Sequence, residues 1–219
     1  TTMKNFNFSL FLSLFFLIIL LPESVDAKRI NKKVDEQGVD MPKVRIASFK
    51  GDKACAISYT FDDALRDQSI LAAPMLEKYG FRGTFWAIPS MVPETEEEIL
   101  TNSKKKWGGI TWKRLKEMSD NGHEISNHGW SHKNLVNLKS EQEIRAEIEK
   151  ADSLILLKIG KKPRTFCYPY NAFNDQVLAI AMEDRVDTRT RCSGWGYRTT
   201  TQWMNNWADG LIKKGEWGI

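Results

Sequence analysis

The chain has 219 residues and a mass of 25.2 kDa, enough for one large domain or two small ones with a sizeable core. Its hydrophobic fraction of 42% and charged fraction of 27% are globular values, which exclude disorder, collagen and coiled-coil arrays for the chain as a whole. A net charge of +4 is too mild for a dedicated nucleic-acid binder, and three cysteines exclude both a disulfide-rich miniprotein and a four-cysteine zinc module.

Residues 1–27 are predicted to form a signal peptide. Lys4 supplies the positive start, the run from Phe8 to Leu21 has serine as its only polar interruption, and small residues precede a cut after Ala27. The alternative is a membrane anchor, but the run of about 14 residues is shorter than the roughly 20 that span a bilayer. We therefore expect export to the periplasm, cell surface or medium, with no stable membrane span after cleavage.

Residues 28–52 are charged and weakly patterned, and we interpret them as a lead-in to one domain over residues 53–219. Strands are predicted over 54–61, 83–88, 123–127, 165–168 and 186–192, and helices over 67–79, 111–120, 140–159 and 174–184. Ser140 with Glu143 forms a capping box, and Gly160 ends that helix. The acidic-then-basic segment 94–106 is interpreted as a solvated surface loop.

The alternation of strands and helices predicts an α/β architecture with a mainly parallel sheet. In the helix over 67–79, the spacing places four apolar residues on one face: Ile70, Leu71, Met75 and Leu76. The carboxyl ends of parallel strands share one rim, and catalytic groups gather there in open and closed sheets alike.

Two adjacent carboxylates, Asp62 and Asp63, follow the first predicted strand. Carboxylates near a core are costly unless something pairs with them. A turn at the strand end can bring both inward, one to bind a metal ion and the other to act as a base. The alternative is an Asp-Asp turn or a helix N-cap before Ala64.

The third predicted strand ends at Asn127 and leads into His128 and His132, four residues apart. Such a pair can bind one ion, although a chance pair on a surface loop remains the alternative. Gly129 stands where a zinc protease would have Glu, which disfavours that class. With Asp63 the histidines form a two-His-one-carboxylate set that leaves a position open for water, as is typical of a catalytic metal site.

A third polar segment, Phe166-Cys167-Tyr168-Pro169-Tyr170-Asn171, follows the fourth predicted strand. Pro169 fixes the backbone there, and Tyr170 can present its N–H or its hydroxyl to a substrate. A strand that ends in an aromatic turn is the alternative interpretation.

The order of these motifs, Thr-Phe-Asp-Asp, then His-x-x-x-His, then Pro-Tyr after a strand, resembles the polysaccharide deacetylase family. This is the NodB-homology group, or carbohydrate esterase family 4, and the similarity extends from Lys53 to Tyr170. The resemblance implies a distorted (β/α) barrel and metal-dependent removal of acetyl groups from an N-acetylated or O-acetylated glycan. A non-catalytic carbohydrate-binding module of the same fold and an acetylxylan esterase are the alternatives.

The resemblance also implies roles for individual residues. Asp62 would be the catalytic base, and Tyr170 would offer its backbone N–H to the tetrahedral oxyanion. The metal ligands would be Asp63, His128 and His132, with Zn²⁺ as the usual ion and Co²⁺ or Ni²⁺ in some members. We expect Tyr170 and Trp130 to contact the substrate. No sequence feature fixes the oligomeric state or indicates a nucleic-acid partner.

Two departures from the family pattern are expected to matter. The family commonly has Arg where Cys167 stands, and Arg189 on the next strand can supply that charge to Asp62. The family's last motif supplies a histidine as general acid, yet no histidine follows His132 here. We therefore expect a reading frame truncated at the C-terminus, an incomplete barrel and weak or absent turnover, with His123 packing or hydrogen-bonding locally.

Overall fold

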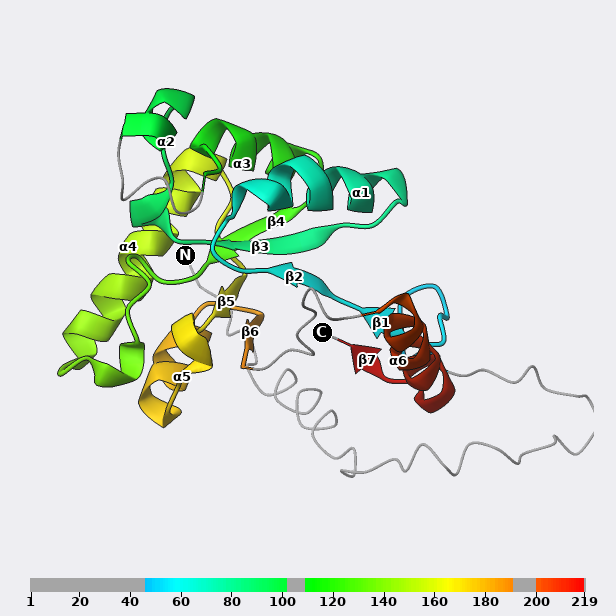
Figure 1. The fold of residues 1–219 in the computed structure, drawn as a ribbon. Helices are drawn as coiled ribbons and strands as arrows, with labels where there is room; N and C mark the ends of the chain where they lie inside the picture. The colour runs from blue at the N-terminus through cyan, green and yellow to red at the C-terminus, as the bar shows by residue number, and fades with distance from the viewer. Residues whose placement is uncertain (1–45, 102–108, 191–199, 219) are drawn as a thin grey trace, which may run out of the picture. The chain divides into compact units, whose positions relative to one another are not determined.

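The computed structural model describes residues 46–101, 109–190 and 200–218. The predicted signal peptide and most of the lead-in lie outside the described residues. Residues 47–219 form one compact unit of strands and helices (Figure 1). Among the described helices, none has the length and apolar character needed to cross a membrane.

A sheet of five parallel strands is the centre of this unit. Its members are β2 (Tyr59–Phe61), β3 (Gly83–Ala87), β4 (Glu124–Asn127), β5 (Thr165–Cys167) and β6 (Asp187–Arg189). The strands lie in chain order, and each is parallel to the next. A doubly wound sheet would reverse its order at a switch point, whereas a (β/α) barrel keeps it. The sheet is thus a curled half-barrel, which confirms the predicted fold class.

Each pair of neighbouring strands is joined by a crossover that contains a helix. The crossover helices are α1 (Ala73–Lys78), α3 (Trp112–Asp120), α4 (Glu141–Ile159) and α5 (Asp175–Met182). Figure 1 shows α1 and α3 running beside β3 and β4, with α5 beside β5 and β6. Right-handed crossovers place these helices on one side of the sheet and the strand carboxyl ends on one rim.

The two faces of the sheet differ in polarity because successive strand residues point in opposite directions. Phe61, Phe85 and Ile125 are in register and pack with Leu115 and Ile155 in a core under the helices. A second core is built from Leu135, Ile144, Ile148, Phe166, Tyr168, Val177, Ile180 and Ala181.

On the other face of the sheet, polar side chains bond to one another. The hydroxyls of Thr84 and Thr165 both donate to the carboxylate of Glu124, at 3.1 and 3.0 Å. The helix-facing side is therefore an apolar core, while the opposite side can carry polar and charged groups toward the rim.

The predicted helix ends are largely confirmed. Thr111 caps α3 by accepting from the Arg114 N–H at 3.3 Å, and Ser140 caps α4 by accepting from Glu143 at 3.2 Å. The Glu143 carboxylate accepts from the backbone N–H of Lys139 instead of Ser140, one residue earlier than a capping box requires. Gly160, with φ of 77°, ends α4.

The strand predicted over 54–61 is divided between two sheets. β1 (Ala56–Ile57) pairs with β7 (Trp217–Gly218) in a separate parallel pair, and only β2 joins the main sheet. The division falls at Ser58, whose N–H donates to the Gly218 carbonyl and whose hydroxyl accepts from the Trp217 indole.

The apolar face predicted for the helix over 67–79 is wrong. Ile70, Leu71 and Met75 are exposed, while Ser69 and Ala73 are buried. The segment begins as a π-helical turn, η2 (Gln68–Ala72), before α1 starts. Because a π turn contains more residues than an α turn, it shifts which residues face the core, and two small side chains allow close packing there.

The loop predicted over 94–106 is also wrong in part, because it contains a helix, α2 (Glu96–Thr101). Thr95 caps it by accepting from the Glu98 N–H at 3.3 Å. Three glutamates in its first turn favour a helix N-terminus electrostatically. None of the residues of α2 is buried, which agrees with the prediction of a solvated segment there, while residues 102–106 of that segment lie outside the described residues. A further helix, α6 (Thr201–Lys214), was not predicted from the sequence.

Candidate metal centre and active site

The chain turns sharply after β2, which brings both aspartates to the rim. Asp63 and Ala64 have φ of 72° and 52°, in the left-handed region that residues with a Cβ rarely adopt. Each such residue costs roughly 1–2 kcal/mol, so the surrounding structure must hold the turn in place. The result is that Asp63 faces the histidines and Asp62 faces Arg189.

His128 lies directly after β4 and is buried. Its backbone N–H donates to the Ala87 carbonyl at 3.0 Å, which extends the β3–β4 pairing. Its Nδ1 lies 2.7 Å from the Cys167 carbonyl oxygen, an acceptor only, so Nδ1 carries the proton. The Nε2 lone pair therefore points away from β5 and is available to a metal ion.

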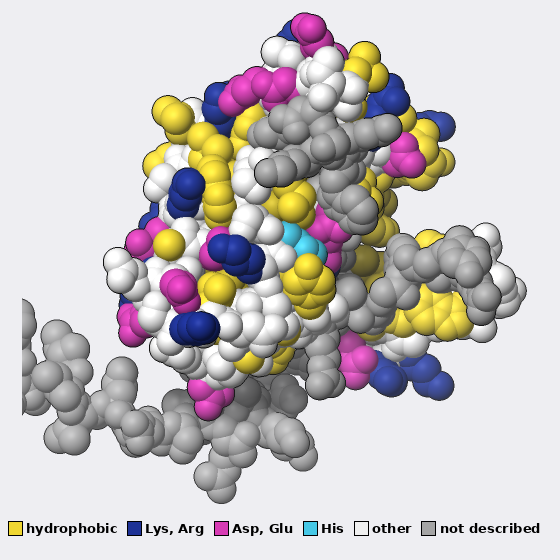
Figure 2. Space-filling model, turned by 60° about the vertical axis from the view of Figure 1, so that its left-hand side comes forward, with side chains coloured by type: hydrophobic (Ala, Val, Ile, Leu, Met, Phe, Trp, Pro, Cys, Tyr) yellow, Lys and Arg dark blue, Asp and Glu magenta, His cyan; other side chains and the backbone are white. Residues whose placement is uncertain are grey.

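His132 completes the cluster from the end of the same loop. It has φ of 57°, and its ring centroid lies 4.9 Å from that of His128 and 4.7 Å from that of Tyr170. Its side chain keeps 22% of its surface exposed, so solvent can reach the cluster. Figure 2 shows a histidine side chain at the surface, beside acidic and hydrophobic side chains.

The three side chains converge with the spacing of metal ligands. Asp63 Oδ1 lies 3.4 Å from His128 Nε2 and 3.5 Å from His132 Nε2, longer than an ordinary N–H···O hydrogen bond. Tetrahedral zinc with bonds of about 2.0–2.1 Å would separate its ligand atoms by about 3.3–3.4 Å. Asp63 Oδ1 is buried and has no hydrogen-bond partner among the described residues. A divalent cation would satisfy this atom, so the residues fit such an ion.

The protonation states also suit a cation. The neighbouring His128 imidazole lowers the pKa of the Asp63 carboxyl, and this effect exceeds the opposing effect of burial. Burial lowers the pKa of His132, and the nearby His128 adds to that shift. At neutral pH the site therefore offers a carboxylate and a neutral imidazole, the forms that bind metals.

Arg189 reaches Asp62 from the far end of the sheet. It is in register with Cys167, and its buried guanidinium donates to Asp62 Oδ2 and, at 3.2 Å, to the Thr60 hydroxyl. The guanidinium also lies over the Trp86 ring, 4.6 Å from its centroid. The structure thus brings a cation to Asp62 although Cys167 occupies the position of the family's usual Arg.

A second group of potential ligands consists of Asp62, His128 and Cys167. Arg189 Nη2 lies 2.9 Å from Cys167 Sγ and also contacts Asp62. A guanidinium already supplies positive charge between these two side chains, so the set containing Asp63 suits a metal ion better.

Two aromatic residues expected at the substrate lie beside the histidines. Tyr170 is 65% exposed and has φ of 62° within the short 3₁₀ turn η5 (Pro169–Asn171). Trp130 lies between the two histidines in sequence and is half-buried, with Lys150 Nζ 3.9 Å from its ring centroid. Lysine covers one face of the Trp130 ring, which leaves Tyr170 as the more accessible aromatic surface.

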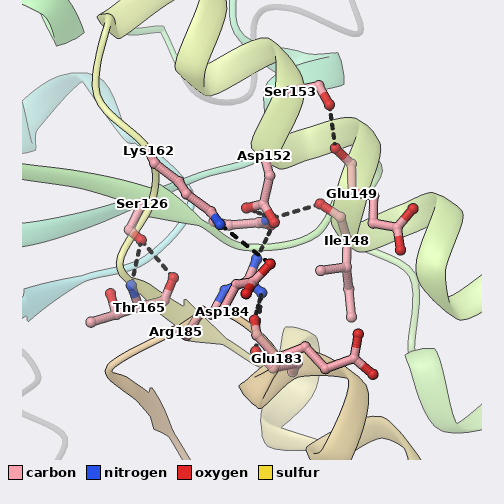
Figure 3. Close-up of polar contacts among 12 residues, drawn as sticks. Ser126, Ile148, Glu149, Asp152, Ser153, Lys162, Thr165, Glu183, Asp184 and Arg185 are labelled. Atoms are coloured by element: carbon pink, nitrogen blue, oxygen red, sulfur yellow. Dashed lines mark hydrogen bonds and ion pairs between the residues drawn. The ribbon is translucent and has the colours of Figure 1, made fainter. Parts of the chain in front are cut away.

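Sequence reasoning missed the residues that hold the histidine loop. Asn127 is fully buried; its amide accepts from the Gly129 N–H at 2.6 Å and donates to Asp152 Oδ1 at 2.7 Å. Figure 3 shows Asp152 reaching from α4 toward Arg185, with which it forms an ion pair. Glu147 on α4 is also buried. The sequence did contain a sign that Glu147 is buried. Its position on α4 falls within the apolar face formed by Ile144, Ile148, Ala151 and Ile155, where a charged residue is unusual.

The fold and site together define a (β/α) barrel protein with a candidate metal centre at its strand ends. A sequence profile described as polysaccharide deacetylase matches residues 50–188, well over half of the chain. The chain belongs to the polysaccharide deacetylase family.

Several known proteins are similar to it. Chitin deacetylase 1 of Cryptococcus neoformans var. grubii is 30% identical over 124 residues, which cover 57% of this chain and 23% of that protein. The peptidoglycan-N-acetylmuramic acid deacetylase PdaC of Bacillus subtilis is 26% identical over 167 residues, 73% of this chain and 31% of that protein. The matches span between 6% and 42% of the curated relatives' lengths.

Solved structures show the same fold. A polysaccharide deacetylase from Bacillus cereus has a TM-score of 0.55 at 17% identity, covering 68% of this chain and 50% of that one. A de-N-acetylase from Aggregatibacter actinomycetemcomitans has a TM-score of 0.53 at 17% identity, covering 68% and 73%. At these identities the similarity is one of fold.

Proposed function

We propose that this protein is a metal-dependent hydrolase that removes acetyl groups from an N-acetylated polysaccharide or oligosaccharide outside the cytoplasm. The observation that carries the proposal is the buried Asp63 Oδ1, which has no hydrogen bond among the described residues and faces two imidazole nitrogens at 3.4 and 3.5 Å. Asp62 lies beside this cluster and is held by Arg189. The similar deacetylases act on acetylated glycans according to their names, which supports the substrate class.

In this proposal Asp63, His128 and His132 hold a divalent cation, Zn²⁺ first and Co²⁺ or Ni²⁺ as alternatives. Bound there, the ion would polarise the acetyl carbonyl and lower the pKa of a coordinated water toward neutrality.

The other residues act on the proton and the oxyanion. Asp62 accepts the proton of the attacking water, and Arg189 keeps its carboxylate oriented. The backbone N–H of Tyr170 donates to the oxyanion; losing one such donor typically costs about 10²–10³ in rate. The Tyr170 ring, with Trp130, contacts the sugar.

Protonation of the leaving amine is the step for which the chain offers no histidine, since its only histidines are His123, His128 and His132. His123 is bonded to Gly83 and Glu77, away from the cluster. We therefore expect slow turnover by these 219 residues. The second candidate is a non-catalytic carbohydrate-binding module of this fold, which would bind a glycan without releasing acetate.

Acetate release tests the proposal. The full chain is incubated with chitooligosaccharide, peptidoglycan fragments or acetylxylan, with added Zn²⁺ and with a chelator. We expect slow release that the chelator abolishes and that Asp62→Asn lowers about 100-fold, because the variant lacks the base. Asp120→Asn, which changes an exposed carboxylate on α3, is the matched control and should retain the rate.

The outcomes separate the candidates. Release from acetylxylan alone would identify an O-acetyl esterase, whereas glycan binding without any acetate would identify the binding module. Turnover at the speed of a complete deacetylase would contradict the role given to the absent histidine.

A further inference from the structure

Glu147 is a carboxylate in an apolar position. It lies on α4 among buried residues that include Ile144, Ile148 and Ala151, and its side chain is only 7% exposed. Burying an ionised carboxylate is costly unless hydrogen bonds and an opposite charge compensate it. The partners of Glu147 therefore show what this position is built to hold.

All of those partners belong to the loop that carries His132. The Glu147 carboxylate accepts from the Ser131 N–H and from the Ser131 hydroxyl, each at 2.9 Å. Lys133 Nζ lies 3.1 Å from Glu147 Oε1, and the Glu147 backbone carbonyl accepts from the Trp130 N–H at 2.8 Å. One residue of α4 thus binds the three loop residues that flank His132.

These contacts restrain a backbone conformation that would otherwise be unfavourable. His132 has φ of 57°, a left-handed conformation that side chains with a Cβ adopt only when their surroundings impose it. The backbone N–H groups of Trp130 and Ser131 are both bonded to Glu147, so the chain that leads into His132 has little freedom. This restraint places the His132 Nε2 at 3.5 Å from Asp63 Oδ1.

We infer that Glu147 is a positioning residue of the metal centre, which fixes His132 through Trp130 and Ser131. The inference rests on the proposed function, because it assumes that His132 binds the ion. Glu147 contacts neither the ion nor the substrate; it raises the affinity for the ion by holding the loop in the binding conformation before the ion arrives.

The dissociation constant for Zn²⁺, measured by competition with a chromophoric chelator, tests this inference on the full chain. Glu147→Gln keeps the shape but replaces an acceptor with an amide that cannot accept all the loop's donors. We expect its Zn²⁺ dissociation constant to rise about tenfold or more, as for other residues that orient metal ligands. Glu149→Gln, two residues further along α4 and exposed, should bind Zn²⁺ like the wild type.

Unfolding of the metal-free protein and the visible spectrum of the Co²⁺ form separate positioning from general stability. A purely structural Glu147 would lower the unfolding midpoint and leave the Zn²⁺ dissociation constant and the Co²⁺ bands unchanged, which would overturn the inference. If Glu147→Gln fails to fold, Ser131→Ala decides. Ser131→Ala loses one hydrogen bond to Glu147, so its Zn²⁺ dissociation constant should rise about three- to tenfold. Ser131→Thr keeps the hydroxyl and should bind Zn²⁺ like the wild type.

The inference and the proposed function fail in different ways. A wild-type chain that binds no Zn²⁺ would refute the metal centre itself. If the wild type binds Zn²⁺ and Glu147→Gln or Ser131→Ala binds it with the same affinity, only the positioning role of Glu147 is refuted.

Discussion

Three residues of the candidate site share one unusual backbone state. Asp63, His132 and Tyr170 have φ of 72°, 57° and 62°, and none of them is a glycine. Each belongs to a different motif and follows a different strand, so the chain accepts local strain at three separate points of the site. Such strain persists only where packing and hydrogen bonds outweigh it. The contacts of Glu147, Asn127 and Arg189 are of this kind.

The pair of Asp62 and Arg189 can be measured directly by a double-mutant cycle. The Arg189 side chain is 6% exposed and the Asp62 side chain 36%, so solvent screens the pair in part. Comparing the unfolding free energies of Asp62→Asn, Arg189→Met and the double variant should give a coupling of about 1–2 kcal/mol, below the value for fully buried pairs. A coupling near zero would mean that Arg189 does not hold Asp62.

At the scale of elements, α4 contributes more than a packing surface. Its apolar face fills both cores, while Glu147 and Asp152 on that face hold the downstream and upstream parts of the histidine loop. Arg185, which follows α5, pairs with Asp152 and lies over the Phe166 ring, 5.4 Å from its centroid. The loop position thus depends on how α4 and α5 pack against β5.

His123 joins three elements in a similar way. Its Nδ1 accepts from the Gly83 N–H at the start of β3, at 3.0 Å, so its Nε2 carries the proton and donates to Glu77 Oε1 on α1. Burial lowers the pKa of His123, and Glu77 opposes that shift only in part. The ring is therefore held neutral in the folded protein.

His123 should lower the free energy of unfolding as the solution becomes more acidic. Below an unperturbed pKa of about 6.5 the unfolded chain binds a proton at His123 that the folded protein resists, so the free energy of unfolding decreases as pH falls. Between pH 7.5 and 5.5 the loss from this residue is at most about 1.4 kcal/mol. Urea unfolding at both pH values should show a smaller decrease for His123→Gln; the lowered pKa of Glu77 acts only at more acidic pH. Parallel decreases in variant and wild type would show that His123 does not contribute.

How far the sequence predicted these elements depends on how local their causes are. The caps Thr111 and Ser140 and the stop at Gly160 act within one helical turn, and all were predicted. The division of the first strand at Ser58 was not, because it depends on β7, which lies 159 residues away at the Trp217–Ser58 contact. The face of α1 was predicted wrongly, because apolar spacing cannot reveal a π turn. The role of Glu147 was also missed, because it depends on contacts with the histidine loop. The sequence shows only that a carboxylate lies on an apolar helix face, and not that a partner loop compensates its burial.

At the scale of the whole domain, one contact shows how strongly the sheet is curled. β2 and β6 are its first and last strands, so in a flat sheet they would lie about 19 Å apart, four spacings of about 4.8 Å. Arg189 on β6 nevertheless bonds to Thr60 on β2 and to Asp62 just after it. Curling brings the rim together, and this is how residues at the ends of β2, β4, β5 and β6 can meet. The order of motifs in the sequence indicated the candidate ligands, but only the curvature explains how Arg189, beside Cys167 on the neighbouring strand, reaches Asp62.

Zinc binding by Asp63, His128 and His132 can be measured as the zinc content of the full chain, by mass spectrometry after dialysis against micromolar Zn²⁺. The wild type should hold about one ion per chain, while His132→Ala and Asp63→Ala should hold almost none, because a site with two protein ligands binds zinc far more weakly than one with three. His123→Gln, which changes the remaining histidine, should keep the ion. Equal zinc content in His132→Ala and the wild type would show that His132 is not a metal ligand.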